Sequence, residues 1–440
     1  MSELDPVIDF DMVADDWVYH GEGNGSILFA YTGEDPQMQN QLLRLVKREV
    51  TPNSSATDST SSSDTLSEKD EQKSMAKLGE GLLYTNIIGS LLGDAYILPQ
   101  RVIRVSVSFI HNLNAAALPI RPAHRTHKEA DPRQAFGVVI ADMVGSGRPD
   151  NGLSQNNNNK RDNFVSVEIK PKWGFLPKSS CISQETSVKR RVCRYCMHQH
   201  LKHGPEMASG FCPLDLYSGN VKRMGRALDC LVSSPQNNLR VFVNGDIVGA
   251  TSDGGLDTDR VPQWTMLRQQ VIDILQTDGI LRKLAHLQSQ LDHLDVEGIF
   301  PLYKRAVANG EMDKHQPTIN EWLNACSRFK TRQSARMLNE SVSGIDDRQA
   351  ILEFMLSVTL KDISILIQIK PWPQNASTSL PICDSNDEDS RRLSGYRMVV
   401  IDTDAKKLAK LPEYFEKDQE IVKHYLENNP DPLEQRPCIE

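Results

Sequence analysis

Three charged residues alternate along the segment VEIKPKWGF, which runs from Val167 to Phe175. They are Glu168, Lys170 and Lys172. The first half of the segment resembles a strand, and side chains at every second position of a strand point to the same side. Burying three charges costs free energy unless something replaces their hydration. The spacing therefore predicts that these side chains face one place where a charged partner binds.

Two aspartates flank later apolar segments. Asp362 begins DISILIQI, and Asp402 ends YRMVVID. Strand ends are where a rigid sheet presents catalytic groups. Phosphoryl transfer needs a base beside the attacking hydroxyl group and a carboxylate that holds Mg²⁺ against the nucleotide phosphates. The pair could fill both roles, although each aspartate alone also fits a turn or a helix cap.

A glycine-rich turn lies between two apolar segments in WVYHGEGNGSILFAYTG, which contains Gly21, Gly23 and Gly25. Such a turn lets main-chain N–H groups approach phosphate oxygens, and an ordinary hairpin is the alternative interpretation. No helix follows it, which excludes a dinucleotide fingerprint and a Walker loop. A strand-loop-strand lid over phosphates is what kinases use. Arg44, on the next strand, is then expected to reach the phosphates.

Several basic segments occur in a chain whose net charge is −8. The overall balance gives no general attraction to nucleic acid or anionic membranes. Solvated surface is the ordinary explanation for charge runs, but several of these segments flank the candidate catalytic strands. They favour a pocket for a highly phosphorylated small molecule. The segments are RPAHRTHK from Arg121, KPK from Lys170, KRRVCRYCMHQHLKH from Lys189, VKRMGR from Val221 and KKLAK from Lys406.

The pair Cys193 and Cys196 in CRYC could contribute to a zinc site with nearby histidines and Cys212. No second Cys-x-x-Cys pair accompanies it, and a buried helix would explain the cysteines equally well. Zinc is therefore judged unlikely. The eight cysteines lack the spacing of a disulfide framework, which agrees with a reducing compartment.

The pattern of apolar residues predicts an α+β protein of two lobes, with a β-rich N-lobe over residues 1–143 and a larger C-lobe over 144–440. A mobile loop is expected over 51–67 and a polar loop over 371–392. No run of about 18 apolar residues occurs, and the N-terminal residues are acidic, which favours a soluble intracellular protein. Strands are expected within 17–33, 41–49, 101–110, 136–143, 362–369 and 396–402, and helices over 82–98, 188–203, 219–232, 263–294 and 411–428.

Seven motifs, in order, resemble the inositol-pentakisphosphate 2-kinase family, especially its animal form. They are EIKPKWGFLP, CRYCMHQHLK, CPLDLYSGN, PQNNLRVFVNG, LDVEGIFPLY, LKDISILI and VVIDTDAKKL. With the glycine loop GEGNGS they cover nearly the whole chain apart from its loops. Plant members carry a late Cys-x-x-Cys zinc site, and this chain has no such pair between Glu297 and Arg348.

The resemblance implies a distantly kinase-like fold whose C-lobe holds a helical insert that binds inositol phosphates. It also implies transfer of the γ-phosphate of ATP to the 2-hydroxyl group of inositol 1,3,4,5,6-pentakisphosphate, with Mg²⁺ as cofactor. The expected product is inositol hexakisphosphate, or phytate. The expected enzyme is a monomer of the cytoplasm, the nucleus or both, with no membrane or direct nucleic-acid partner.

Roles carry over by position. Asp362 corresponds to the catalytic base, Asp402 to the magnesium ligand with Asp362 as a second candidate, and Lys170 to a catalytic lysine on the ATP phosphates. The other ATP contacts implied are Gly23, Asn24, Gly25, Ser26, Arg44, Ala141, Asp142, Met143, Glu168 and Arg240. The inositol phosphate contacts implied are Arg125, Lys172, Lys202, Asn237, Lys406, Lys410 and Tyr414.

Two other classes of protein remain as alternatives. One is a scaffold that binds inositol polyphosphates without catalysis. It would not need Asp362 and Asp402 beside an anionic ligand. The other is a zinc-stabilised nucleic-acid binder built on CRYCMHQH, which the acidic balance and the missing second Cys pair disfavour.

Overall fold

The computed structural model describes residues 7, 8, 10, 12–50, 67–145, 164–204, 209–310, 316–337, 345–370, 395–431 and 437–440. The chain forms two compact units. Unit 1 comprises residues 1–82, 98–165 and 242–246, and unit 2 comprises 83–97, 166–241 and 247–440. The lobe boundary at residues 143 and 144 remains a prediction. The loop expected over 51–67 lies outside the described residues except for Ser67, and so does the loop expected over 371–392.

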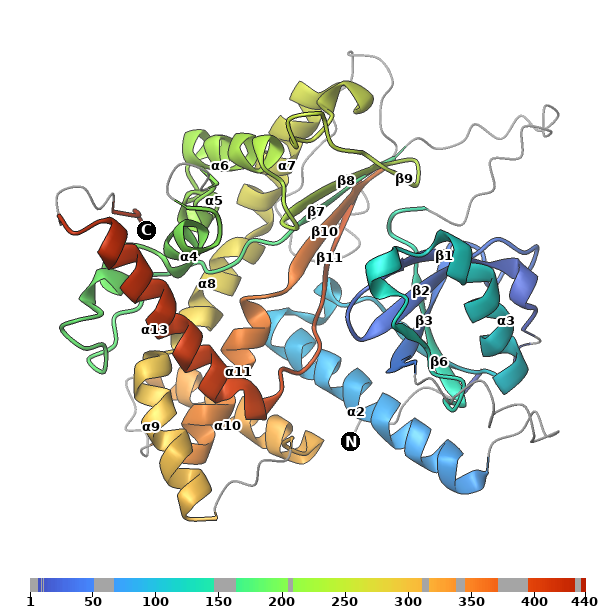
Figure 1. Ribbon diagram of the computed structural model, residues 1–440, viewed down its shortest axis with the longest axis horizontal. Helices are drawn as coiled ribbons and strands as arrows, with labels where there is room; N and C mark the ends of the chain where they lie inside the picture. Colours follow the sequence, from blue (N-terminus) through green and yellow to red (C-terminus); the bar gives the residue numbers. More distant parts are fainter. Residues whose placement is uncertain are drawn as a thin grey trace. The chain divides into compact units, whose positions relative to one another are not determined.

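Unit 1 is built on an antiparallel sheet with strand order β1-β2-β3-β6-β4, and β5 pairs with β3 (Figure 1). The hairpin predicted around the glycine turn is confirmed, since β1 ends at Glu22 and β2 begins at Ser26. The strands are β1 (Trp17–Glu22), β2 (Ser26–Tyr31), β3 (Gln41–Glu49), β4 (Gln100–Arg104), β5 (Lys128–Ala130) and β6 (Phe136–Ala141).

Two predictions for the first part of the chain, one of a helix and one of a strand, were wrong in their bounds. Helix α2 (Glu68–Leu92) begins earlier than residue 82 and ends before Gly93, whose φ of 117° favours glycine. The segment expected to be β-rich over 101–110 is a strand only as far as Arg104. Ser106 then caps helix α3 (Val107–Ala117) by accepting from the Phe109 N–H. Helix α3 contributes buried apolar residues to the core of unit 1.

Unit 2 contains a second sheet with strand order β11-β10-β7-β8-β9 (Figure 1). Together the two sheets and the many helices confirm the α+β class. Strand β7 is buried along its whole length, including the polar residues Ser166 and Glu168. The strands are β7 (Val165–Ile169), β8 (Leu239–Val243), β9 (Asp246–Ile247), β10 (Ser364–Ile369) and β11 (Tyr396–Ile401).

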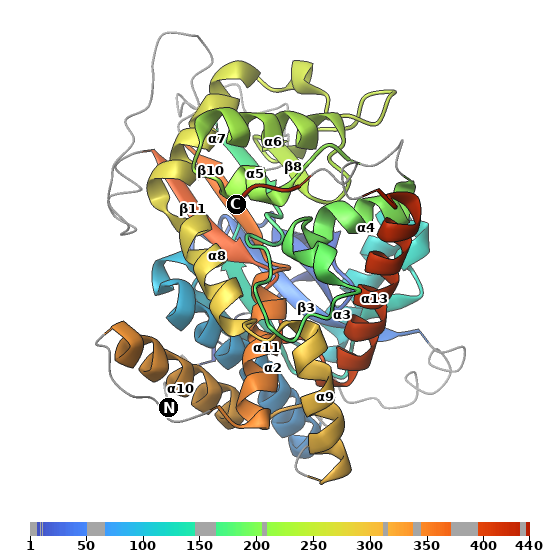
Figure 2. The same cartoon turned by 90° about the vertical axis from the view of Figure 1, so that its left-hand side faces the viewer.

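Helices form the rest of unit 2, and α13 packs against both α4 and α9 (Figure 2). The bounds predicted for the last helix agree with the structure. The helix expected over 188–203 is a 3-10 turn (Ser187–Arg190) followed by α4, and the one expected over 263–294 is divided at Gly279, whose φ is 82°. The helices are α4 (Arg194–His203), α5 (Pro213–Tyr217), α6 (Val221–Ser233), α7 (Trp264–Asp278), α8 (Ile280–Leu291), α9 (Asp295–Ala308), α10 (Ile319–Met337), α11 (Asp347–Leu360) and α13 (Leu411–Asn428).

Among the described residues, none of the helices combines the length and the apolar character needed to cross a bilayer.

Candidate active site

Asp362 and Asp402 lie at the same end of the sheet in unit 2. Strands β10 and β11 are antiparallel and pair Ser364 with Ile401. Asp362 comes just before the first strand and Asp402 directly after the second, so the register places both carboxylates beside one another's strand end. The side chains are about half exposed, at 47% and 50%. Both can therefore reach a ligand that approaches this end of the sheet.

The lysines of the KPK motif meet these aspartates. Lys170 Nζ lies 2.5 Å from Asp402 Oδ2 and donates to the Asp362 carbonyl at 3.3 Å. Lys172 Nζ lies 3.5 Å from Asp362 Oδ1, and Lys406 binds the other oxygen of the same carboxylate. The structure thus brings together five residues whose roles were expected from the sequence, and they come from three separate parts of the chain.

The geometric reason given for this convergence was wrong. Strand β7 ends at Ile169, so only Glu168 of the three alternating charges lies on it. Lys170 follows the strand, and Lys172 has a φ of 60°, outside the strand region. Irregular backbone with a left-handed φ at Lys172, and not strand alternation, directs Lys172 to Asp362. Asp402 also has a positive φ, of 63°. Strained backbone of this kind is common at functional sites, where the surrounding contacts maintain it.

The charges in this cluster shift one another's pKa. Burial lowers the pKa of Lys172; Asp362 opposes that shift, while Lys170 and Lys406 reinforce it. Burial alone would raise the pKa of Asp362, but the ammonium groups of Lys406, Lys172 and Lys170 outweigh it and hold that pKa below its ordinary value. Asp362 is therefore an ionised carboxylate at neutral pH, which is the state that a general base requires.

Further polar contacts connect Asp402 to Ser364, Glu168 and Arg240. Ser364 Oγ lies 2.9 Å from Glu168 Oε1 and 3.2 Å from Asp402 Oδ2. Arg240 Nη1 lies 3.2 Å from Glu168 Oε2. Glu168 and Arg240, both expected near ATP, therefore contact each other. Ser364 was missed, because a serine inside an apolar strand carries no distinctive sequence signal.

The other residues of unit 2 that were expected to bind inositol phosphates do not belong to this cluster of ion pairs. Lys202 lies exposed on α4, and Lys410 lies exposed just before α13. Burial raises the pKa of Tyr414, and the charge of Asp362 adds to this shift, which places the phenol in the electrostatic field of the site. Asn237 is exposed. Its neighbour Asn238 is buried, and the Asn238 backbone carbonyl accepts from the Lys170 N–H at 2.9 Å. Asn238 was missed.

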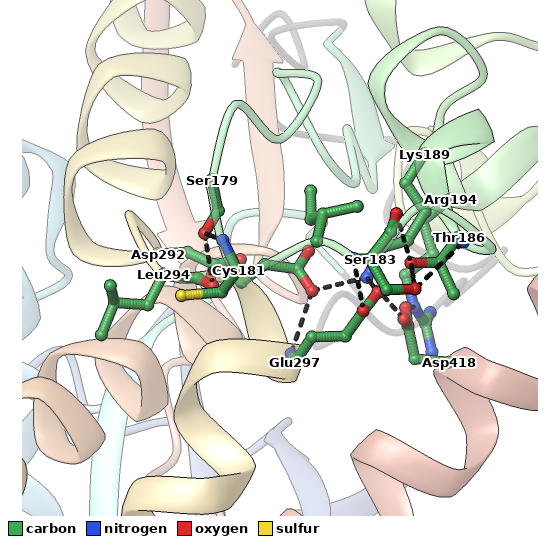
Figure 3. A network of polar contacts seen from close by, with 12 residues as sticks. Ser179, Cys181, Ser183, Thr186, Lys189, Arg194, Asp292, Leu294, Glu297 and Asp418 are labelled. Atoms are coloured by element: carbon green, nitrogen blue, oxygen red, sulfur yellow. Dashed lines mark hydrogen bonds and ion pairs between the residues drawn. The ribbon is translucent and has the colours of Figure 1, made fainter.

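A buried lysine joins the helices that carry these candidates (Figure 3). Lys189 Nζ lies 2.7 Å from Asp418 of α13 and 3.1 Å from Glu297 of α9, and it also binds Asp295. Arg194 of α4 approaches Asp418 at 3.2 Å. Although three carboxylates converge here, the ammonium group already supplies the cation. The network fixes α13 against α4 and α9 rather than forming a metal site.

In unit 1, the expected nucleotide loop is an open hairpin. Gly23 and Gly25 are exposed with Asn24, and a Cβ atom at either glycine would meet no atom within 4 Å. Ser26 begins β2, and Arg44 lies on β3 opposite Leu28 and Val138. Neither glycine has a positive φ, so the backbone conformation does not require glycine here. The absence of side chains instead leaves room for a ligand.

Three of the expected ATP contacts, Ala141, Asp142 and Met143, lie at the end of β6. Ala141 is its last residue, and Met143 is buried. The Asp142 carboxylate accepts from the N–H groups of Val144 and Gly145 at 2.8 and 2.7 Å. Asp142 therefore has a demonstrable structural role in this turn, and its contact with ATP remains a prediction.

Arg121, which the sequence analysis noted only as part of a basic segment, holds the segment of Arg125. It donates to both carboxylate oxygens of Glu22 at 2.8 Å and to the carbonyl groups of Arg125 and Lys128. Burial would raise the pKa of Glu22, but hydrogen bonds from Arg121 and Lys47 lower it to about 2. This buried group connects the end of β1 to the segment that carries Arg125.

Four cysteines converge elsewhere in unit 2. The sulfur atoms of Cys193, Cys196, Cys212 and Cys438 lie within 4.8 Å of one another. Four thiolates are a common donor set for structural zinc, so the residues present fit this metal. Zinc was judged unlikely because no second Cys-x-x-Cys pair occurs. That reason fails, since two cysteines from distant segments complete the set.

Half-exposed carboxylates and several lysines at one end of a sheet define a site suited to an enzyme that handles phosphate groups. The sequence pattern of the family described as "Inositol-pentakisphosphate 2-kinase" matches residues 19–420. The chain is 32% identical to an inositol-pentakisphosphate 2-kinase of Oryza sativa subsp. indica, over 94% of both chains. It is 27% identical to that of Danio rerio, over 96% of this chain and 95% of the relative. The chain belongs to the inositol-pentakisphosphate 2-kinase family.

Proposed function

We propose that this enzyme transfers the γ-phosphate of ATP to the 2-hydroxyl group of inositol 1,3,4,5,6-pentakisphosphate and so makes inositol hexakisphosphate. The observation that supports this most directly is the meeting of Lys170, Lys172 and Lys406 with two carboxylates at one end of the sheet. The family to which the chain belongs supplies the substrate class.

Asp362 would act as the general base. It accepts the proton of the 2-hydroxyl group while that oxygen forms a bond to the γ-phosphorus, and the bond from this phosphorus to the bridging oxygen breaks to release ADP. Its lowered pKa keeps it ready to accept this proton. Asp402 would hold Mg²⁺, which when bound offsets the negative charge of the phosphates.

The lysines would divide the two anions between them. Lys170 contacts Asp402, the proposed magnesium ligand, which favours the ATP phosphates as its target. Lys172 and Lys406 contact Asp362 and would bind phosphates of the inositol ring. The ring carries five phosphomonoesters of about −1.5 to −2 each, so it requires several cations. Lys202, Lys410, Arg125, Asn237 and Tyr414 are proposed as further contacts.

For ATP we propose contacts from the glycine loop (Gly23, Asn24, Gly25 and Ser26), from Arg44, from the β6 end (Ala141, Asp142 and Met143), and from Glu168 and Arg240. All of them lie within residues 19–420, which the family pattern matches, and the open hairpin geometry supports the loop.

Turnover against a panel of inositol phosphates, with the product isomer identified, tests the proposal. We expect ATP consumption with the 1,3,4,5,6-pentakisphosphate and formation of the hexakisphosphate. A scaffold without catalysis would bind this ligand but consume no ATP. That outcome, or phosphorylation of a different hydroxyl group, would overturn the proposal.

A further inference from the structure

The position of Lys172 requires an explanation that the cluster itself does not provide. Its φ of 60° is unfavourable for a residue with a side chain, so contacts must maintain it. The contacts are at its carbonyl oxygen. That oxygen accepts from Gln288 Nε2 at 3.0 Å and from the Tyr217 hydroxyl group at 3.1 Å.

The same Gln288 amide also holds the segment that precedes Asp362. Its Nε2 group donates to the Leu360 carbonyl at 3.0 Å, and Leu360 is the last residue of α11. Its Oε1 atom accepts from the Gly174 N–H at 2.8 Å. Gln288 is completely buried, so water cannot replace these bonds. One amide group thus donates both to the irregular segment of Lys172 and to the end of the helix that precedes Asp362.

Gln288 is itself firmly placed. It lies in α8, and its backbone carbonyl accepts from Ser357 Oγ of α11 at 3.0 Å. Its side chain contacts the Lys172 and Leu360 carbonyl groups and, at 3.4 Å, the Tyr217 hydroxyl group, and not the ammonium group of Lys172 or the carboxylate of Asp362. A buried amide that joins two backbone segments at this point sets the separation of their side chains, as a support for a catalytic group must.

We propose that Gln288 is a positioning residue that sets the distance between Lys172 and Asp362, and with it the choice of hydroxyl group. This rests on the proposed function. Lys172 would hold a ring phosphate and Asp362 would accept a proton from the ring, so their separation selects which hydroxyl group faces the base. A shift of about 1 Å at such a site can reduce the rate roughly a hundredfold.

The test compares two buried glutamines of unit 2. Gln288→Met removes the amide behind the site. Gln349→Met removes a similar amide of α11, which donates to the Ala325 carbonyl at 2.8 Å and to Glu353. We expect Gln288→Met to lower kcat about tenfold to a hundredfold and to raise KM for the inositol substrate, with KM for ATP changed less than about twofold. Gln349→Met should lower the melting temperature and leave kcat within about twofold.

A milder variant guards against loss of folding. Tyr217→Phe removes the hydroxyl group, which is the second donor to the Lys172 carbonyl beside the Gln288 amide, and should shift kcat in the same direction by a smaller factor. In the substrate panel, Gln288→Met and Tyr217→Phe should also phosphorylate other inositol phosphates at a larger fraction of their rate with the pentakisphosphate. If Gln288→Met and Tyr217→Phe match the Gln349→Met control in kcat and selectivity, the positioning role is wrong. If the parent enzyme itself does not turn over, the proposed function fails instead.

Discussion

The Asp362 carboxylate forms ion pairs with two lysines in the protein without ligands. Lys406 binds one of its oxygens and Lys172 lies near the other. Since ring phosphates would compete for both lysines, a bound substrate would free the carboxylate that must accept the proton. The same lysines lower the pKa of Asp362, so the base should remain ionised well into acid.

Lys406→Met tests this electrostatic link. A carboxylate is ionised above its pKa, and loss of one neighbouring cation should return the pKa of Asp362 toward its ordinary value of 3.8. The acid limb of the kcat profile should therefore move to higher pH, while KM for the inositol substrate rises. Lys407→Met, at the exposed next position, is the control and should leave the profile unchanged. An acid limb that stays in place in Lys406→Met would show that this lysine does not tune the base.

The charged residues that meet at the site could be picked out from the sequence. The residues that hold their backbone in place could not. Lys170, Asp362 and Asp402 stand out because charges flank apolar segments. The Gln288 side chain and the Asn238 backbone carbonyl contact residues far away in the chain. Neither a polar side chain in a helix nor a carbonyl group in a loop gives any sign of such a partner until the fold brings them together.

Among the elements of the site, β10 and β11 were predicted well because apolar runs define them, whereas β7 ends before Lys170 and Lys172. The bounds of α2 and the division between α7 and α8 were not predicted well. Gly93 and Gly279 end or divide these helices through their positive φ angles, and the apolar spacing continues past them. The cysteine cluster was recognised only in part. Cys193, Cys196 and Cys212 were named from the sequence, whereas Cys438 joins them only through the tertiary fold.

The cysteine cluster makes a prediction about metal content. Elemental analysis should find one zinc per chain, and a strong chelator should lower the melting temperature because structural zinc contributes to folding. Cys438→Ser should reduce the zinc content, whereas Cys181→Ser, an exposed cysteine outside the cluster, should not. Parent protein that contains no zinc after purification without chelators would contradict this.

At the scale of the whole molecule, an acidic chain with a net charge of −8 must attract a strongly anionic substrate. Local cations accomplish this, since the site lysines are only 14 to 23% exposed and lie together. Such attraction is screened by salt. We expect KM for the inositol substrate to rise more steeply with KCl concentration than KM for ATP, because the ring carries more charge. Equal salt dependence of the two constants would argue against a pocket built from these lysines.

Binding and turnover measured together in Asp362→Asn test the central claim most directly. The substitution removes the proposed base and one negative charge while it preserves shape. The account predicts that kcat falls by about two to four orders of magnitude, while affinity for inositol 1,3,4,5,6-pentakisphosphate stays the same or increases. A variant that turns over near the parent rate would contradict the assignment of Asp362 and the mechanism that depends on it.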